Sequence, residues 1–95
     1  MNTWPFDQPQ NCAVVTLRQV IEKAQPILLV VHDAEDHGWQ FLSGQPHDMS
    51  DAKLVSLGSI VRADSSLFAI ADLPPGWQAT RESSEGEWTR TPSQP

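Results

Sequence analysis

Two segments of the chain repeat one arrangement of apolar and polar positions. Residues 13–21 read AVVTLRQVI and residues 53–61 read KLVSLGSIV, with the hydroxyl residues Thr16 and Ser56 forty positions apart. In each segment an apolar run precedes the hydroxyl residue, and a leucine and two β-branched residues follow it at helical spacing. The pattern predicts a short strand that leads into a helix in both segments, beginning with a strand at Cys12–Val15.

The hydroxyl residues are the expected N-caps of the two helices, because a Ser or Thr oxygen can accept a backbone N–H of the first turn. Thr16 would cap a helix over Leu17–Ala24, which Pro26 ends. Ser56 would cap a helix over 57–64, and one or two further helical turns would follow it.

A hairpin is expected after the first helix, because two apolar strands flank a polar turn. Ile27–Asp33 and Gly38–Ser43 are the strands, and residues 34–37 are the turn. A four-residue loop would place His32 opposite Trp39. Both faces of this hairpin carry apolar side chains, which predicts a central place in the sheet or cover on both sides.

A second hairpin is expected over Trp77–Glu82 and Glu87–Thr91, around the turn 83–86. This register would place Arg81 opposite Trp88. One face would be polar and solvated, and the other would turn inward or toward a partner. The residues of that second face are Trp77, Ala79, Arg81, Trp88 and Arg90.

These elements predict an α+β fold with an antiparallel or mixed sheet of five to six strands and two to three helices. The order strand–helix–strand–strand occurs in half-repeats over about 12–43 and 52–91, which suggests an internal duplication. The 95 residues are expected to form one domain. Residues 1–11 would be an extended arm with docked aromatic side chains, and residues 92–95 a flexible tail.

The composition narrows the range of partners. The hydrophobic fraction of 39% is typical of a globular chain. The net charge is −6 with only six Lys and Arg, which argues against nucleic acid and against an anionic membrane surface. A basic protein partner fits this charge better. The single cysteine, Cys12, allows no internal disulfide and favours a reducing compartment. No signal peptide is evident at the N-terminus, so we expect a cytoplasmic protein.

The chain lacks recognisable catalytic motifs, so an enzyme is not expected and no cofactor is implied. The densest group of potential metal ligands is the turn His32–His37, to which His47 could contribute. Neighbouring side chains in a turn diverge, and no helical His or Glu spacing supports a preformed site. A solvated acidic turn is the favoured interpretation, and a metal-dependent hydrolase using these residues is the alternative.

Aromatic and arginine side chains are the best candidates for partner contacts. A guanidinium stacked on an indole is favourable by roughly 0.5–2 kcal/mol, both in cores and at interfaces. A structural role is preferred for the pairs Arg81–Trp88 and His32–Trp39. The partner-binding candidates are Trp77, Arg81, Trp88, Arg90, Trp39 and His32.

Several stretches together resemble a family of small bacterial domains, some of which are described as immunity proteins of polymorphic toxin systems. The stretches lie within residues 26–90 and are Pro26–Val30, His32-Asp33, Gly38–Leu42, His47-Asp48 and Asp72–Trp77, with Arg81 and Trp88. This resemblance implies a protein partner and no catalytic residues.

The expected function is therefore non-catalytic protein binding, similar to that of an immunity or regulatory protein. The metal-dependent hydrolase is one alternative. The other is a structural module that forms a homodimer through a strand edge or through its Trp face.

Overall fold

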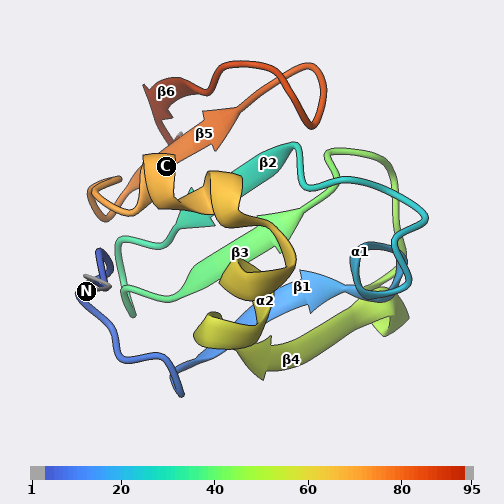
Figure 1. Ribbon diagram of the computed structural model, residues 1–95, viewed down its shortest axis with the longest axis horizontal. Coiled ribbons are helices and arrows are strands. Elements are labelled where there is room, and N and C mark those ends of the chain that lie inside the picture. Colours follow the sequence, from blue (N-terminus) through green and yellow to red (C-terminus); the bar gives the residue numbers. More distant parts are fainter. Residues whose placement is uncertain (1–3, 94–95) are drawn as a thin grey trace.

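A computed structural model describes residues 4–93 of the protein (Figure 1). The main elements follow the order strand, helix, strand, strand, and this order then recurs. They are β1 (Ala13–Leu17), α1 (Arg18–Ile21), β2 (Leu29–His32), β3 (Trp39–Leu42), η1 (Met49–Asp51), β4 (Ala52–Ser56), α2 (Leu57–Ala63), η2 (Ser65–Ile70), β5 (Trp77–Thr80) and β6 (Thr89–Pro92), where η marks a 3₁₀ helix.

The six strands form one mixed sheet in the order β4-β1-β3-β2-β5-β6. β1 and β3 are parallel, and every other neighbouring pair is antiparallel. The predicted α+β class with a mixed sheet is confirmed. The hairpin β2–β3 is central, as its two apolar faces indicated, and His32 pairs with Trp39 as predicted.

The two half-repeats share their element order but not their arrangement in the sheet. In the first half, β1 lies beside β3 in parallel. In the second half, β4 and β6 lie at opposite edges of the sheet, and β4 pairs with β1 instead. The repeated order therefore does not produce two equivalent structural units.

The prediction for the first helix was wrong in its cap and its length. Thr16 belongs to β1 and its buried hydroxyl donates to the Phe41 carbonyl (2.8 Å), which removes it from the helix end. The N-cap is Leu17, which makes no side-chain cap bond. The helix ends after one turn because Lys23 takes a left-handed conformation (φ 62°). As a result Ile21, which shares the helical spacing of Leu17 and Val20, is 48% exposed.

The second helix matches its prediction closely. The Ser56 hydroxyl accepts the Ser59 N–H (3.1 Å), so Ser56 is the expected N-cap of α2. The further helical turns are η2, whose N-cap is Asp64. Leu57, Ile60 and Val61 of α2 are buried, as their spacing predicted.

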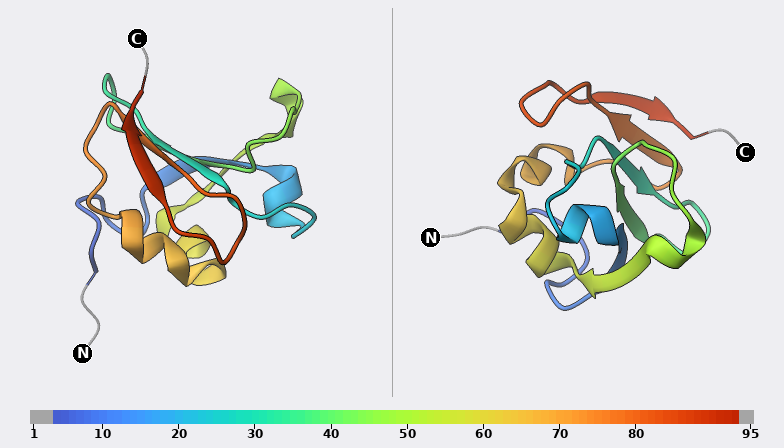
Figure 2. Two further views of the ribbon diagram at one scale, coloured as in Figure 1. Left: turned by 90° about the horizontal axis from the view of Figure 1, so that it is seen from above. Right: turned by 90° about the vertical axis from the view of Figure 1, so that its right-hand side faces the viewer.

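The helices α2 and η2 lie on one side of the sheet, and η1 stands on the other, as the two views in Figure 2 show. The hydrophobic core lies between the sheet and the first of these layers. Its largest fully buried side chains include Trp39, Phe41, Leu57, Leu67 and Ile70. Fully burying one such side chain stabilises the fold by roughly 1.5–3 kcal/mol.

Both ends of the described chain pack onto this body. Phe6 of the predicted arm is buried, with its ring edge toward Trp39 (centroids 5.2 Å apart). The flexible tail expected at 92–95 was wrong at its start, because Pro92 belongs to β6 and the Ser93 N–H donates to the Gly76 carbonyl (2.7 Å). Residues 94 and 95 lie outside the described part.

Candidate functional site

The face of the second hairpin that was expected to turn inward or toward a partner forms a structural clamp within the protein. Arg81 is buried, and its guanidinium lies over the Trp88 ring (4.1 Å to the centroid). Its Nη2 contacts Asp64 Oδ2 (2.9 Å), and Nε donates to the Ile27 carbonyl (3.0 Å). Nη1 donates to the Ser66 hydroxyl (2.9 Å). Arg81 therefore ties the end of β5 to the start of η2, which leaves its charge no role at a surface.

The other residues of this hairpin also contact the body of the protein. Arg90 forms an ion pair with Asp72 (2.8 Å) and donates to the Ala69 carbonyl (2.6 Å), which joins β6 to η2. The hydrogen bond from Arg90 holds the pKa of Asp72 below its usual value of 3.8. Trp77 and Trp88 are half-buried against the core. This face turns inward.

His32 and Trp39 form a stacked pair inside the core. Their rings lie 4.0 Å apart at an angle of 14°, and both side chains are buried. The His32 Nδ1 donates to the Leu73 carbonyl (2.6 Å), while the buried Nε2 has no hydrogen-bond partner among residues 4–93. Of the predicted partner contacts, His32, Trp39 and Arg81 are thus buried, with at most 7% of each residue exposed.

The rings of His32 and His37 lie 6.3 Å apart (centroid to centroid), but the described residues of the alternative metal site do not converge on one point. His32 is committed to Leu73 and Trp39, whereas His37 and His47 are exposed. The carboxylates of Asp33 and Asp36 accept backbone N–H groups of their own turn. Among residues 4–93, no three His, Cys, Asp or Glu side chains are grouped to hold a metal ion.

On the sheet face opposite α2 and η2, none of the outward strand positions within residues 4–93 is a charged residue. The charged side chains of η1 and α1, among them Asp51 and Arg18, lie at one end of this side of the sheet. The strand pairing aligns Leu54, Val15, Gln40, Val31, Gln78 and Thr91 in one row across all six strands. The neighbouring outward positions are also uncharged, and we call the whole set the uncovered face. These further positions are Ala13, Leu17, Leu29, Leu42, Ala52, Ser56, Thr80 and Thr89. Leu17, at the end of β1, is the one outward position in this set that is fully buried.

Two large apolar side chains protrude at the uncovered face or beside it. Leu54, at the edge strand β4, is 72% exposed, and Met49 of η1 is 93% exposed. The loop after β3 adds a shallow hollow of about 430 Å³ beside Leu29 and Leu42. Exposed large apolar side chains on a charge-free surface are typical of protein contact sites.

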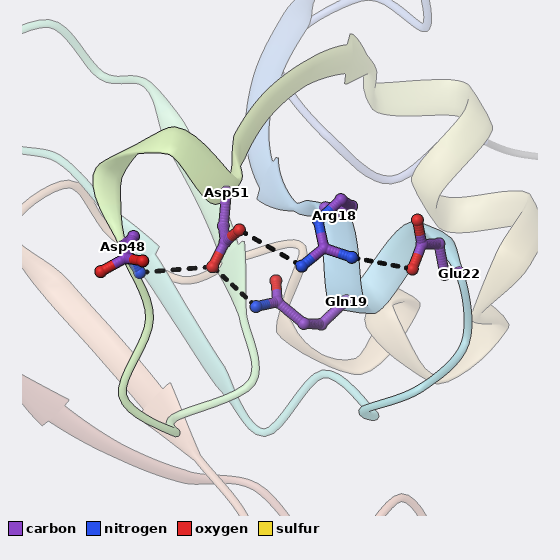
Figure 3. A network of polar contacts seen from close by, with 5 residues as sticks. All are labelled: Arg18, Gln19, Glu22, Asp48 and Asp51. Atoms are coloured by element: carbon purple, nitrogen blue, oxygen red, sulfur yellow. Dashed lines mark hydrogen bonds and ion pairs between the residues drawn. The ribbon is translucent and has the colours of Figure 1, made fainter.

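A polar network fixes η1 to α1 (Figure 3). Asp51 accepts hydrogen bonds from Gln19 (2.7 Å) and from the Asp48 backbone (3.3 Å), and it contacts Arg18 (3.4 Å). Arg18 also pairs with Glu22 (3.0 Å). These contacts, led by the hydrogen bond from Gln19, lower the pKa of Asp51 from 3.8. The network fixes the position of η1, the short helix that carries Met49.

A second opening lies on the opposite side of the molecule, between α1 and α2. It is a groove of about 600 Å³ that also reaches the β5–β6 loop at Ser84. Its lining combines aliphatic side chains and Pro26 with polar or charged side chains, among them Lys23 and Ser59. The aliphatic residues are Val20, Ile21, Ile27, Val55, Ile60 and Ala63.

Sequence reasoning did not find either of these surfaces. The alternation of half-buried and buried positions in β2 and β3 shows the uncovered face. Its sequence signal is weak, because apolar Leu29, Val31 and Leu42 are indistinguishable by type from core residues. The groove exists because α1 stops after one turn, which the helical spacing through Ala24 had argued against.

Comparisons with known proteins add no relative: no family model, no curated protein and no solved structure matches the chain. Within residues 4–93, no helix has the length and apolar character to cross a membrane.

Proposed function

We propose that the protein is a non-catalytic protein-binding domain and that its contact surface is the uncovered face. The observation that carries this proposal is the absence of any charged side chain at the outward strand positions of a chain with net charge −6. Charged residues are depleted at the centres of protein interfaces, where desolvating them is costly. Leu54 and Met49 supply apolar contacts at the margin of this surface.

The acidic side chains are placed where they would attract a basic partner. Exposed Glu35 and Asp36 lie in the β2–β3 turn, and Glu82, Glu85 and Glu87 flank the β5–β6 turn. Charges outside a contact surface speed the encounter of two proteins, whereas the apolar centre supplies the affinity. A partner with a basic rim and an apolar centre fits this distribution.

The resemblance of residues 26–90 to small bacterial domains is consistent with an immunity or regulatory role toward such a partner. The single cysteine is consistent with action in the cytoplasm.

The test is capture of a partner from the source cell with the unmodified chain and two matched variants. Leu54→Asp places a charge on the uncovered face, whereas Phe68→Asp places one on η2, where Phe68 is 50% exposed. We expect one protein to bind the unmodified chain and Phe68→Asp, and to be lost by Leu54→Asp. Its association rate should fall as salt rises.

Equal capture by both variants, or no capture at low salt, would contradict the proposal. Self-association through the same surface is the alternative, since β4 is an edge strand with Leu54 exposed. Light scattering across a concentration series distinguishes the two, because a dimer that Leu54→Asp dissociates needs no second protein.

A further inference from the structure

We propose that the groove between α1 and α2 binds a single-chain amphiphile that ends in a carboxylate, such as a medium-chain fatty acid. This inference is independent of the proposed function, since the groove lies on the side of the sheet opposite the uncovered face. It depends on the shape of the groove, on the aliphatic side chains in its lining and on Lys23 at its rim, which makes no ion pair in the described part of the chain.

The groove is an opening toward the core. Ile27 and Ile60 are buried, whereas Ile21 is 48% exposed. A volume of about 600 Å³ lies within the range of small-molecule sites, which are mostly apolar with a few polar groups. Among residues 4–93, the apolar part of the lining is aliphatic and no aromatic ring lines the groove, which suits a flexible hydrocarbon chain better than a planar ligand.

The charges that line the groove differ in whether they are already neutralised. Asp64 pairs with Arg81 and also accepts from the Ser66 N–H (3.1 Å), so its carboxylate is satisfied. Lys23 makes no ion pair within residues 4–93. Within residues 4–93, the groove therefore presents one available positive charge and no available negative charge, which selects an anionic head group.

The backbone conformation keeps this lysine at the rim. Lys23 has φ 62°, a left-handed conformation that costs a non-glycine residue energy and that glycine usually supplies after a helix. The left-handed residue ends α1 after one turn. Ile21 is consequently left exposed, and Lys23 lies at the same opening. The left-handed conformation of Lys23 thus accounts both for the exposure of Ile21 and for the position of the lysine side chain at the groove.

The direct test is calorimetric titration with decanoate, decanol and decyltrimethylammonium below their micelle concentrations, together with amide chemical shifts. We expect saturable binding of decanoate that shifts Val55 and Ile60, weaker binding of decanol and none of the cation. Octanoate should bind roughly tenfold more weakly than decanoate, because each buried methylene strengthens binding by up to about fourfold.

Three variants assign the binding to the groove. Lys23→Gln should lower the affinity for decanoate by roughly three- to fivefold and leave the affinity for decanol unchanged. Lys53→Gln is its matched control, since Lys53 is an exposed lysine that does not line the groove. Ile21→Asp should weaken both ligands more than tenfold, and the exposure of Ile21 allows this variant to fold, which circular dichroism checks.

Equal affinity for the cation, unchanged binding by Ile21→Asp, or no saturable binding would each overturn the proposal. Amide chemical shifts of the groove residues that change with protein concentration in the absence of ligand would also overturn it, because a second copy of the chain would then occupy the groove. Leu54→Asp should bind decanoate normally, so a failure here is separate from a failure of the proposed protein contact.

Discussion

Val30 and Val31 are neighbours in β2, yet they point to opposite faces of the sheet and meet different surroundings. Val30 is fully buried beneath α2 and η2, between Phe41 and Ala79. Val31 is half-buried on the uncovered face, between Gln40 and Gln78. The same residue type on the same strand therefore holds the fold together on one face and remains available for contact on the other.

The polar residues of the two faces differ in the same way. On the covered side, arginines are tied to carbonyls and carboxylates of η2 and its surroundings. On the uncovered face the polar side chains are neutral amides and hydroxyls. Buried charge thus serves the fold, and the surface proposed for binding carries none that would have to be desolvated.

The largest expected effect concerns Arg81, whose side chain is only 1% exposed. Arg81→Met should lower the free energy of unfolding by about 3 kcal/mol, because Asp64 loses its charge partner and the Ile27 carbonyl its donor. Arg90→Met is the control, since the Arg90 side chain is 35% exposed and should contribute about 0–1 kcal/mol. Urea denaturation of both variants measures the difference. Equal losses would mean that the clamp is no more important than a surface pair.

A matched pair of substitutions in β2 tests the difference between the faces. Val30→Thr buries a hydroxyl without a partner and should destabilise the protein by roughly 1–3 kcal/mol. Val31→Thr should change stability by less than about 0.5 kcal/mol, because water can reach its hydroxyl. Thermal and urea unfolding provide the comparison. A large loss for Val31→Thr would show that the uncovered face is packed in solution, as it would be in a tight dimer.

The smallest effect concerns the network that holds η1. The pKa of Asp51 in the folded protein lies below 3.8, so its ionised form stabilises the fold above that pH. This contribution is lost as the pH falls through the lower folded pKa. Asp51→Asn should therefore be less stable than the unmodified chain at neutral pH and approach it in acid. Parallel pH titrations of both proteins by circular dichroism test this; a constant difference down to acid pH would assign the loss to packing.

Local signals in the sequence predicted much of the fold. The cap at Ser56, both hairpin turns and the pairing of His32 with Trp39 follow from side-chain chemistry and turn length. Thr16 has the same cap chemistry as Ser56, but its hydroxyl bonds to Phe41 on a neighbouring strand. The Thr16 hydroxyl could either cap a helix or bond to another strand, and its hydrogen bond to a residue 25 positions away determines which of these occurs. No local sequence pattern predicts such a long-range contact.

The sequence by itself determined the order of the elements, the strand faces and the acidic balance, because these depend on residue type and spacing. Tertiary structure alone decided which face of the sheet the helices cover, and that β4 pairs with β1 at one edge. It also decided that α1 ends at Lys23 and leaves a groove. These outcomes depend on packing between segments that are distant in sequence. An apolar residue can take part in such packing, but its type does not determine which segment it packs against.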